Sequence, residues 1–347
     1  MPLIAVRQGD KYRLKDIETN SFVSDRLYDE TELHEVDLGC TRIYTDPEVF
    51  LSEYFCKGNY GLKNKMGQKV TPPVYKSIWI PNGADYALVQ KGRSELKGLW
   101  GVADATGREI ASCKYTRICP FHEGFALVFN GDFISYDNRT GKIKYKNKRY
   151  GFIDKSGEEV IPLQYDEASS FSSGLAAVKL GNLWGYIDKA GCFKVPLSFD
   201  KAETFSEDMA AIKVGGKYGF IDKTGMIKIL PIYSRVKPFC NGGAIVWKGD
   251  KTGVIDKNGV VIVPIIYDLI IRIADENFYL INLDGKSGIL DAQYRFLTKV
   301  AYDNADLLFD KYPYVTIDGI AYLVSGEGAL SELGDISSPD PYMNLPF

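Results

Sequence analysis

The chain contains a unit that recurs along most of its length: an aromatic residue and a glycine, then Ile-Asp-Lys-x-Gly, then Tyr-Asp. The clearest copies begin at Tyr150, Trp184 and Tyr218, and weaker copies begin at Thr252 and Ser287. The glycines of these pairs are residues 151, 185, 219, 253 and 288, with spacings of 34, 34, 34 and 35 residues. A fixed period of this length is typical of repeat proteins, in which each unit buries its apolar side chains against its neighbours.

Within one unit, short runs of alternating apolar residues predict β-strands joined by tight turns. In the unit covering 175–208 we expect three strands, at 175–179, 183–188 and 192–195. Pro196 should end the third strand, because proline has no N–H to donate to a ladder. Asp188 and Gly191 predict a turn in which the carboxylate accepts backbone N–H groups and the glycine takes a positive φ. The rest of the unit, with apolar residues at every third position, should form a bulged fourth strand or a bent connector.

An aromatic residue lies 14 positions after each anchor glycine. The pairs are Gly61 and Tyr75, Gly101 and Tyr115, Gly151 and Tyr165, Gly185 and Phe199, Gly219 and Tyr233, Gly253 and Tyr267, and Gly288 and Tyr302. This offset predicts a single repeat domain over 1–330, followed by a flexible, proline-rich tail at 331–347. The predicted units are 3–34, 35–83, 84–124, 125–174, 175–208, 209–242, 243–276, 277–310 and a partial one at 311–324.

The run Trp-Gly-Tyr-Ile-Asp-Lys-x-Gly at 184–191 is followed by Pro-x-x-Phe-Asp, and Phe-Ser-x-x-Leu-Ala-x-Val stands at 171–178. This combination resembles the WG-containing repeat family of bacterial proteins. The resemblance covers nearly the whole chain and is best between Phe152 and Asp268, whereas the first, second and eighth units depart from it. It implies a β-repeat scaffold that acts as an interaction module, and it brings no catalytic residues.

Eight short antiparallel β-units fit two arrangements. We favour a β-propeller of about eight units, because the inner period is almost constant and closure removes exposed sheet edges. The alternative is an open β-repeat stack or solenoid. The longer outer steps of 40 and 50 residues favour that alternative, since they suit terminal capping units.

Composition narrows the function classes. The 347 residues carry 42 basic and 45 acidic side chains, and a net charge of −3 gives no global attraction to nucleic acid or membrane. No apolar run is long enough to span a membrane, and the first residues lack the features of a signal peptide. Six scattered cysteines show no repeating position, so we expect reduced thiols and a cytoplasmic protein.

Residues that carry catalysis or hold cofactors are scarce. Histidine occurs only at His34 and His122, too few for a three-histidine zinc site, and His122 fills a turn position. No phosphate-binding loop or nucleophile motif is present. The recurring Asp154, Asp188, Asp222 and Asp256 each precede a glycine by three residues, so we interpret them as turn residues. We therefore predict no enzyme activity, no cofactor and no metal.

The repeat is interrupted in the fourth unit, where about 16 extra residues precede Gly151. They predict an added β-hairpin over 130–149, turning at Asn138–Gly141. Its candidate partner-binding residues are Tyr136, Lys142, Lys144, Tyr145, Lys146 and Lys148. The four lysines should share one face, which suits an acidic partner or a phosphate backbone. Alternatively, they protect an edge strand from aggregation.

These features favour a non-enzymatic scaffold that mediates protein–protein interaction. A glycan-binding protein is the alternative from another class, with Trp79 and Trp247 as candidate stacking surfaces. Binding of nucleic acid through the 130–149 hairpin is less favoured, because few other basic clusters extend such a strip. Function should lie where the repeat breaks: the hairpin, the irregular first three units and the C-terminal tail.

Overall fold

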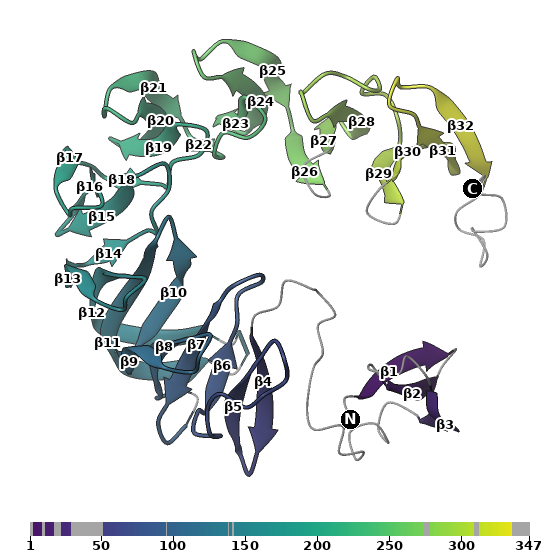
Figure 1. Ribbon diagram of the computed structural model, residues 1–347. Helices are drawn as coiled ribbons and strands as arrows, with labels where there is room; N and C mark the ends of the chain where they lie inside the picture. The colour runs from purple at the N-terminus through teal and green to yellow at the C-terminus, as the bar shows by residue number, and fades with distance from the viewer. Residues whose placement is uncertain are drawn as a thin grey trace. The chain divides into compact units, whose positions relative to one another are not determined.

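The computed structural model contains antiparallel β-sheets throughout the residues that it describes (Figure 1). These are residues 51–94, 96–137, 139–140, 142–273, 278–308 and 312–334, together with the backbone of 3–8, 11–16 and 22–28. The predicted all-β, tandem-repeat fold is therefore confirmed. Most sheets have four strands, and neighbouring strands in a sheet follow one another in the chain.

Contacts divide the chain into two compact units, Met1–Asp166 and Glu167–Phe347. The strands of the first unit are β1 (Leu3–Gln8), β2 (Lys11–Asp16), β3 (Phe22–Tyr28), β4 (Leu51–Cys56), β5 (Asn59–Asn64), β6 (Ser77–Trp79), β7 (Tyr86–Lys91), β8 (Leu99–Asp104), β9 (Glu109–Tyr115), β10 (Arg117–His122), β11 (Phe125–Asp137), β12 (Lys142–Asp154) and β13 (Glu159–Tyr165). They form sheets β1–β3, β4–β5, β6–β9 and β10–β13.

The second unit holds five more sheets in the described residues. Its strands are β14 (Glu167–Ala168), β15 (Ala176–Leu180), β16 (Leu183–Ile187), β17 (Phe193–Phe199), β18 (Lys201–Ala202), β19 (Met209–Val214), β20 (Lys217–Asp222), β21 (Ile227–Tyr233), β22 (Arg235–Val236), β23 (Gly243–Lys248), β24 (Lys251–Asp256), β25 (Val261–Tyr267), β26 (Leu269–Ile273), β27 (Phe278–Leu283), β28 (Lys286–Asp291), β29 (Asn304–Leu308), β30 (Tyr312–Ile317), β31 (Ile320–Val324) and β32 (Leu330–Gly334). The sheets are β14–β17, β18–β21, β22–β25, β26–β28 and β29–β32.

The sheets are offset from the sequence units by one strand. The apolar segment predicted as the end of one unit, such as the residues after Phe199, supplies the short first strand of the next sheet, β18. The predicted end of a strand at Pro196 is wrong, since β17 runs through it. The proline is tolerated because β17 is an edge strand with a register shift against β16, where no ladder N–H is required.

The register explains both the anchor glycine and the aromatic residue 14 positions later. Trp184, which precedes Gly185, pairs across the strands with Phe199, and the register shift brings the β17 backbone close to Gly185. A Cβ atom at Gly185 would lie 2.6 Å from the Val195 carbonyl oxygen. Equivalent Cβ atoms at residues 101, 151, 219 and 253 would lie 2.3–2.6 Å from a carbonyl oxygen of the fourth strand. These positions need glycine for space.

The hydrophobic core lies between successive sheets of a unit. One cluster joins Tyr186 and Val195 of the β14–β17 sheet to Ile212 and Ile221 of the β18–β21 sheet. The central strands are therefore buried on both faces, and β15 shows three consecutive buried residues where strict alternation was expected. The prediction that stacking on neighbours supplies the core is confirmed.

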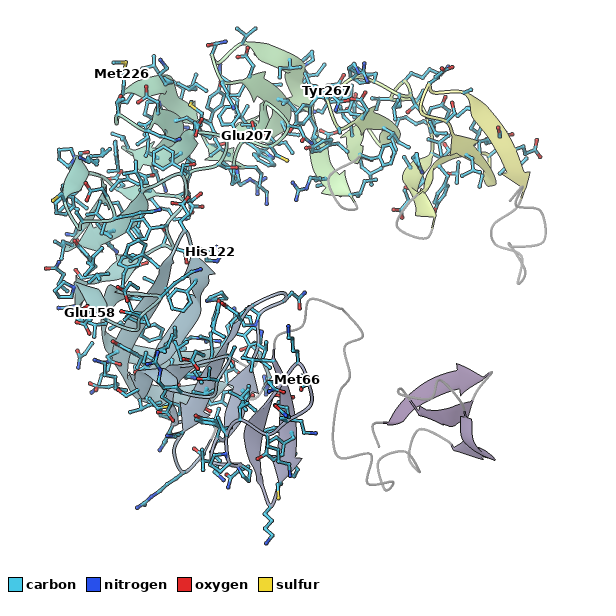
Figure 2. The ribbon with its side chains drawn as sticks, in the orientation of Figure 1. Met66, His122, Glu158, Glu207, Met226 and Tyr267 are labelled. Carbon is cyan, nitrogen blue, oxygen red and sulfur yellow. The ribbon has the colours of Figure 1, made fainter. Side chains whose placement is uncertain are left out.

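Adjacent sheets are also linked by hydrogen bonds at the turn between the first and second strands of each sheet. Ser172 Oγ donates to the Phe205 carbonyl at 2.7 Å, and Ser206 Oγ donates to the Phe239 carbonyl at 2.7 Å. In the β18–β21 sheet, Glu207 lies in the turn between β18 and β19, and Met226 lies in the turn between β20 and β21 (Figure 2). The repeated Phe-Ser pair therefore connects one sheet to the next.

Two features at the ends differ from the predicted units. The partial ninth unit at 311–324 belongs to the complete four-stranded sheet β29–β32. Residues 331–334 of the predicted tail lie in β32, and the rest of the tail is outside the described residues. His34 also lies outside the described residues. The choice between a closed ring and an open stack stays a prediction.

Candidate partner-binding site

The predicted hairpin is present and consists of the distal halves of β11 and β12, each of which has 13 residues. In the regular sheet, Leu180 pairs with Leu183 across a two-residue turn. In β10–β13 the equivalent pair is Asn130 and Arg149, so 131–148 replaces that turn. At the tip, Asp137 accepts hydrogen bonds from the Arg139 N–H and the Thr140 hydroxyl.

Two register shifts determine which side chains share a face of the hairpin. Asn130 pairs with Arg149 and Asp132 with Lys146, so Asn147 and Lys148 together oppose Gly131. Asn147 has a φ of 50° at this bulge. The bulge moves Lys148 to the face of Tyr145, where its Nζ lies 5.5 Å from the Tyr150 ring centroid.

The predicted strip of four lysines on one face is therefore wrong for Lys148. Lys142, Lys144 and Lys146 alternate without interruption, opposite Asp137, Ser135 and Asp132 respectively. The other face carries Ile143 and Tyr145, which pair with Tyr136 and Phe133. One inserted residue changes the face because side chains alternate along a strand with a period of two.

The face that contains Tyr145 forms an open groove of about 440 Å³. Its lining consists of Arg117, Phe129, Ile134, Ile143, Lys144, Tyr145, Lys148 and Tyr150. The Phe129 ring centroid lies 5.6 Å from that of Tyr145 and 5.0 Å from that of Tyr150. Ile134 is 53% exposed and Tyr136 is 40% exposed, so apolar surface remains accessible next to the cations.

The hairpin carries a local positive charge in an acidic chain. Residues 130–149 include six basic and two acidic side chains, whereas the whole chain has a net charge of −3. Arg149 forms an ion pair with Asp166 at 2.5 Å. Within the described residues, no acidic group lies within ion-pair distance of Arg117, the three lysines of the strip or Lys148. These cations are therefore available to an external anionic group.

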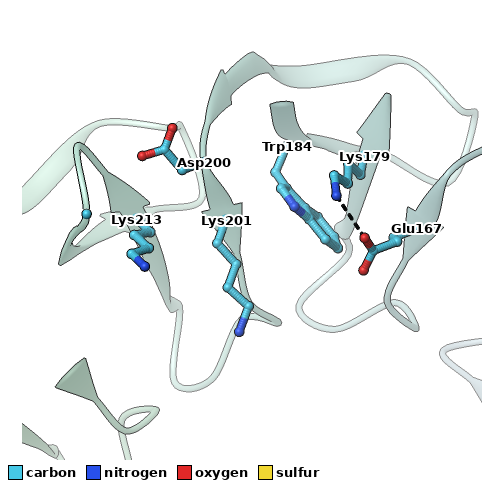
Figure 3. Close-up of a pocket in the computed structure, with 7 residues that line it drawn as sticks. Glu167, Lys179, Trp184, Asp200, Lys201 and Lys213 are labelled. Carbon is cyan, nitrogen blue, oxygen red and sulfur yellow. Dashed lines mark hydrogen bonds and ion pairs between the residues drawn. The ribbon is translucent and has the colours of Figure 1, made fainter. Parts of the chain in front are cut away.

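In the compact unit Glu167–Phe347, the positions equivalent to Arg117, Phe129 and Tyr150 are Glu167, Lys179 and Trp184. They line a groove of about 330 Å³ with a different charge pattern. It is lined by Glu167, Lys179, Trp184, Asp200, Lys201, Lys213 and Gly216. Figure 3 shows the Trp184 ring beside the ion pair of Glu167 and Lys179, whose charged atoms are 2.8 Å apart. Lys201 pairs with Glu203 at 2.5 Å. Internal acids therefore neutralise most of the cations in this groove.

The recurring aspartates act as turn residues, as predicted. Asp188 Oδ1 accepts hydrogen bonds from the backbone N–H groups of Ala190 and Cys192, and Asp256 makes the equivalent pair of bonds. The hydrogen bond from the Cys192 N–H is the main cause that lowers the pKa of Asp188 below its ordinary value. For Asp222, the Thr224 hydroxyl has the largest lowering effect on the pKa. These carboxylates hold the turns of the scaffold.

Other sequence candidates have simpler roles. His122 is exposed at the end of β10. Trp247 is 7% exposed, and the Arg235 guanidinium lies 4.2 Å from its ring centroid, so this indole is not an open stacking surface. Trp79 is 49% exposed. In the described ranges, no group of three or more His, Cys, Asp or Glu side chains is arranged to hold a metal ion.

Comparison with protein families places the repeat. The model of the WG containing repeat matches residues 60–93, 100–132, 150–184, 184–218, 218–251 and 253–286, which together make up more than half of the chain. The chain belongs to the WG containing repeat family. Residues 133–149 lie between two consecutive WG repeats, so most of the hairpin is an insertion into the repeat series.

Two solved structures that match this WG repeat protein share little sequence with it. A crystal structure of the eukaryotic initiation factor has 13% identity and a TM-score of 0.45, with 94% of each chain covered. Hsv2p of Kluyveromyces lactis has 10% identity and a TM-score of 0.36, covering 77% of this chain and 94% of its own. A search of curated proteins gave no match.

In the part of the chain that the structure describes, no helix has the length and apolar character needed to cross a bilayer.

Proposed function

We propose that this WG repeat protein is a non-enzymatic scaffold that binds a protein partner through the 130–149 hairpin. The observation that carries the proposal is the insertion of a cationic and aromatic hairpin between two WG repeats. The repeated residues serve the fold, because the glycines make room for the fourth strand and the aspartates bind turn N–H groups. Among the described inserted residues, Phe133 contacts Lys97 in the loop between β7 and β8, with 5.2 Å from the Lys97 Nζ to its ring centroid, whereas Ile134 and Tyr136 are exposed.

Exposure and charge support an interface at this position. Interfaces are enriched in aromatic residues and arginine, and the groove combines Phe129, Tyr145, Tyr150 and Arg117. The neighbouring lysines add an electrostatic attraction that raises the rate of association with an acidic surface. The alternative role of the lysines, protection of an edge strand, is compatible with binding, because both depend on the same exposed charges.

The test compares the full chain with a variant whose hairpin is shortened. Replacing 131–148 by Gly-Asn reproduces the regular turn at 181–182, since Asn130 and Arg149 occupy the positions of Leu180 and Leu183. A partner captured by the full chain, identified by mass spectrometry and then purified, should bind the full chain directly and lose binding to the shortened variant. Equal binding of both would remove the hairpin as the site, and a small-molecule product from the full chain would remove the non-enzymatic role.

Glycan binding is a second candidate function, and Trp184 is the residue that favours it. Its half-buried ring lies in the groove with the carboxylates of Glu167 and Asp200. An aromatic face flanked by hydrogen-bonding groups suits a sugar ring. A glycan array should give a signal with the full chain that is lost in Trp184→Ala, and an array without signal would reject this function.

We also propose that the protein acts in the cytoplasm. The support comes from the described cysteines, at 56, 113, 119, 192 and 240, which are free thiols. Free thiols are typical of reducing compartments. Subcellular fractionation with a soluble cytoplasmic marker tests this location.

A further inference from the structure

Along the distal half of the hairpin, one edge of β12 has no partner strand among the described residues. The pairing of β13 with β12 reaches Tyr150, which is opposite Tyr165, and does not continue along the lysine-rich half of β12. From Lys142 to Lys146 this strand pairs only with β11, in the described part of the chain. Its outward N–H and C=O groups are therefore available for an added strand.

The side chains along this edge would select the residues of an added strand. Lys142, Lys144 and Lys146 lie on one face, and Ile143 and Tyr145 lie on the other. Side chains opposite one another in neighbouring strands interact directly, and like charges in that position are unfavourable. A strand beside β12 would therefore need acidic residues on the lysine face and apolar residues on the tyrosine face.

The lysine charges that keep most strands from pairing with β12 would attract an acidic strand. Lysines on an exposed edge discourage pairing, because a neutral or basic strand would desolvate or repel them. Asp137 and Asp132 lie opposite Lys142 and Lys146 on β11, but no described acidic group is within ion-pair distance of the three ammonium groups, so an acidic strand on the open side would add counter-charges. The edge is thus closed to strands of other composition, including a second copy of its own sequence.

We propose that β12 binds an extended, acidic protein segment with alternating acidic and apolar residues, which adds as a strand along Lys142–Lys146. The groove next to Tyr145 accommodates one of its apolar side chains. This inference rests on the proposed function and specifies the chemistry of its partner. A protein segment fits better than single-stranded nucleic acid, because the edge offers main-chain hydrogen bonds and the lysines occupy one face only.

The probe is a labelled peptide, acetyl-Glu-Val-Glu-Tyr-Glu-Val-Glu-amide, whose binding to the full chain is measured by fluorescence anisotropy at low and high salt. Its matched controls are a peptide of the same composition with all the acids in one block, and a single-stranded DNA oligonucleotide. Two further peptides carry N-methyl groups on alternate residues, one set on the odd and one on the even positions. Methylation removes the N–H donors on one side of the added strand.

The protein variants test whether binding depends on where the lysines lie or only on the total charge of the protein. Lys142→Glu, Lys144→Glu and Lys146→Glu together reverse the charge of the edge. The control variant makes the same change at exposed lysines elsewhere that have no described acidic partner, through Lys217→Glu, Lys237→Glu and Lys248→Glu. We expect the edge variant to bind the acidic peptide at least about tenfold more weakly and to bind a Lys-Val-Lys-Tyr-Lys-Val-Lys peptide instead. The control variant should bind like the full chain.

The outcomes distinguish this inference from the proposed function. Loss of binding with one N-methylated set and not with the other supports strand addition. Equal affinity for the block peptide, or tighter binding of the oligonucleotide through the same lysines, overturns the proposal. If the alternating peptide fails while the shortened hairpin still abolishes capture of the cellular partner, the scaffold function stands and only the proposed partner chemistry is wrong.

Discussion

Two sheets of the molecule carry different residues at the same set of paired positions across their first three strands. In β14–β17 the row across the first three strands contains Glu167, Lys179 and Trp184, and its acid and base form an ion pair. In β10–β13 the equivalent row contains Arg117, Phe129 and Tyr150. The acid is replaced by a base and the base by an aromatic ring, while the backbone pairing is the same.

The difference shows that the repeat scaffold accepts a long, charged insertion without losing its fold. The anchor glycine and the closing aromatic are present in both sheets, with Gly151 and Tyr165 in one and Gly185 and Phe199 in the other. What changes is the length and charge of the turn between the second and third strands. The four predictions that follow test whether packing and binding are separate in this way.

The largest expected effect is on packing, at an anchor glycine. Gly219→Ala would place a Cβ 2.3 Å from the Ile229 carbonyl oxygen, so the fourth strand must move. We expect a loss of about 3 kcal/mol in the free energy of unfolding, measured by urea denaturation. Gly131→Ala in the hairpin is the matched control, because its Cβ would lie 3.0 Å from Lys148 Cγ and 3.2 Å from the Lys146 carbonyl oxygen, distances that a shift of a few tenths of an ångström relieves. Similar losses in both variants would contradict the separation.

A smaller effect is expected at the link between sheets. Ser206→Ala removes the hydrogen bond to the Phe239 carbonyl and should lower the free energy of unfolding by about 1 kcal/mol. His122 takes the serine position in β10–β13 and is exposed, so His122→Ala should change stability by less than about 0.5 kcal/mol. Thermal unfolding of both variants checks this, and a larger effect at His122 would show that the hairpin sheet depends on its own link.

The third expected effect, in order of size, is a loss of the stability contributed by the turn aspartates at low pH. The pKa values of Asp154 and Asp222 are lowered, mainly by the hydroxyls of Ser156 and Thr224, from an ordinary value of 3.8. A lowered pKa in the folded state stabilises the protein above pH 3.8, and this contribution is lost as the pH falls through the folded-state pKa. Unfolding midpoints measured down to pH 2.5, about one unit below that value, should decline less steeply in Asp222→Asn. An unchanged slope would assign acid sensitivity to other groups.

The smallest expected effect is that of removing a hairpin charge on the free energy of unfolding. Lys144 has no ion pair in the described residues, so Lys144→Ser should change the free energy of unfolding by less than about 0.5 kcal/mol. Glu167→Gln breaks an exposed ion pair and should lower it by about 0.2–1 kcal/mol at low salt. Denaturation at two salt concentrations measures both. A greater loss in Lys144→Ser would mean that the lysines stabilise the fold itself.

Several features were readable from local sequence. The turn aspartates, the short strands and the position of the inserted hairpin depend on residues within a few positions of one another. Asp188, for example, binds N–H groups two and four residues ahead. The 14-residue offset was also visible, although its cause was not, since the pairing of Trp184 with Phe199 depends on a register shift between strands.

The faces of the hairpin needed the structure for the same reason. Lysines at 142, 144, 146 and 148 have the spacing of a single face in a regular strand. The bulge at Asn147 arises where two residues of β12 oppose the single Gly131 of β11, and it moves Lys148 beside Tyr150. Nothing in the spacing of the lysines indicates an inserted residue. The hairpin was therefore located correctly along the chain, and its four lysines were divided incorrectly between its faces.

The period, the all-β character and the WG repeat family of this protein follow from its residues alone, because these properties depend on residue types at fixed spacing. The tertiary structure was needed to show why Gly185 cannot carry a side chain, which sheet receives the strand after Phe199, and which cations near Tyr145 have no acidic partner among the described residues. Those properties arise where strands distant in sequence meet. There, backbone space and charge pairing depend on register, which the residues of one strand do not specify.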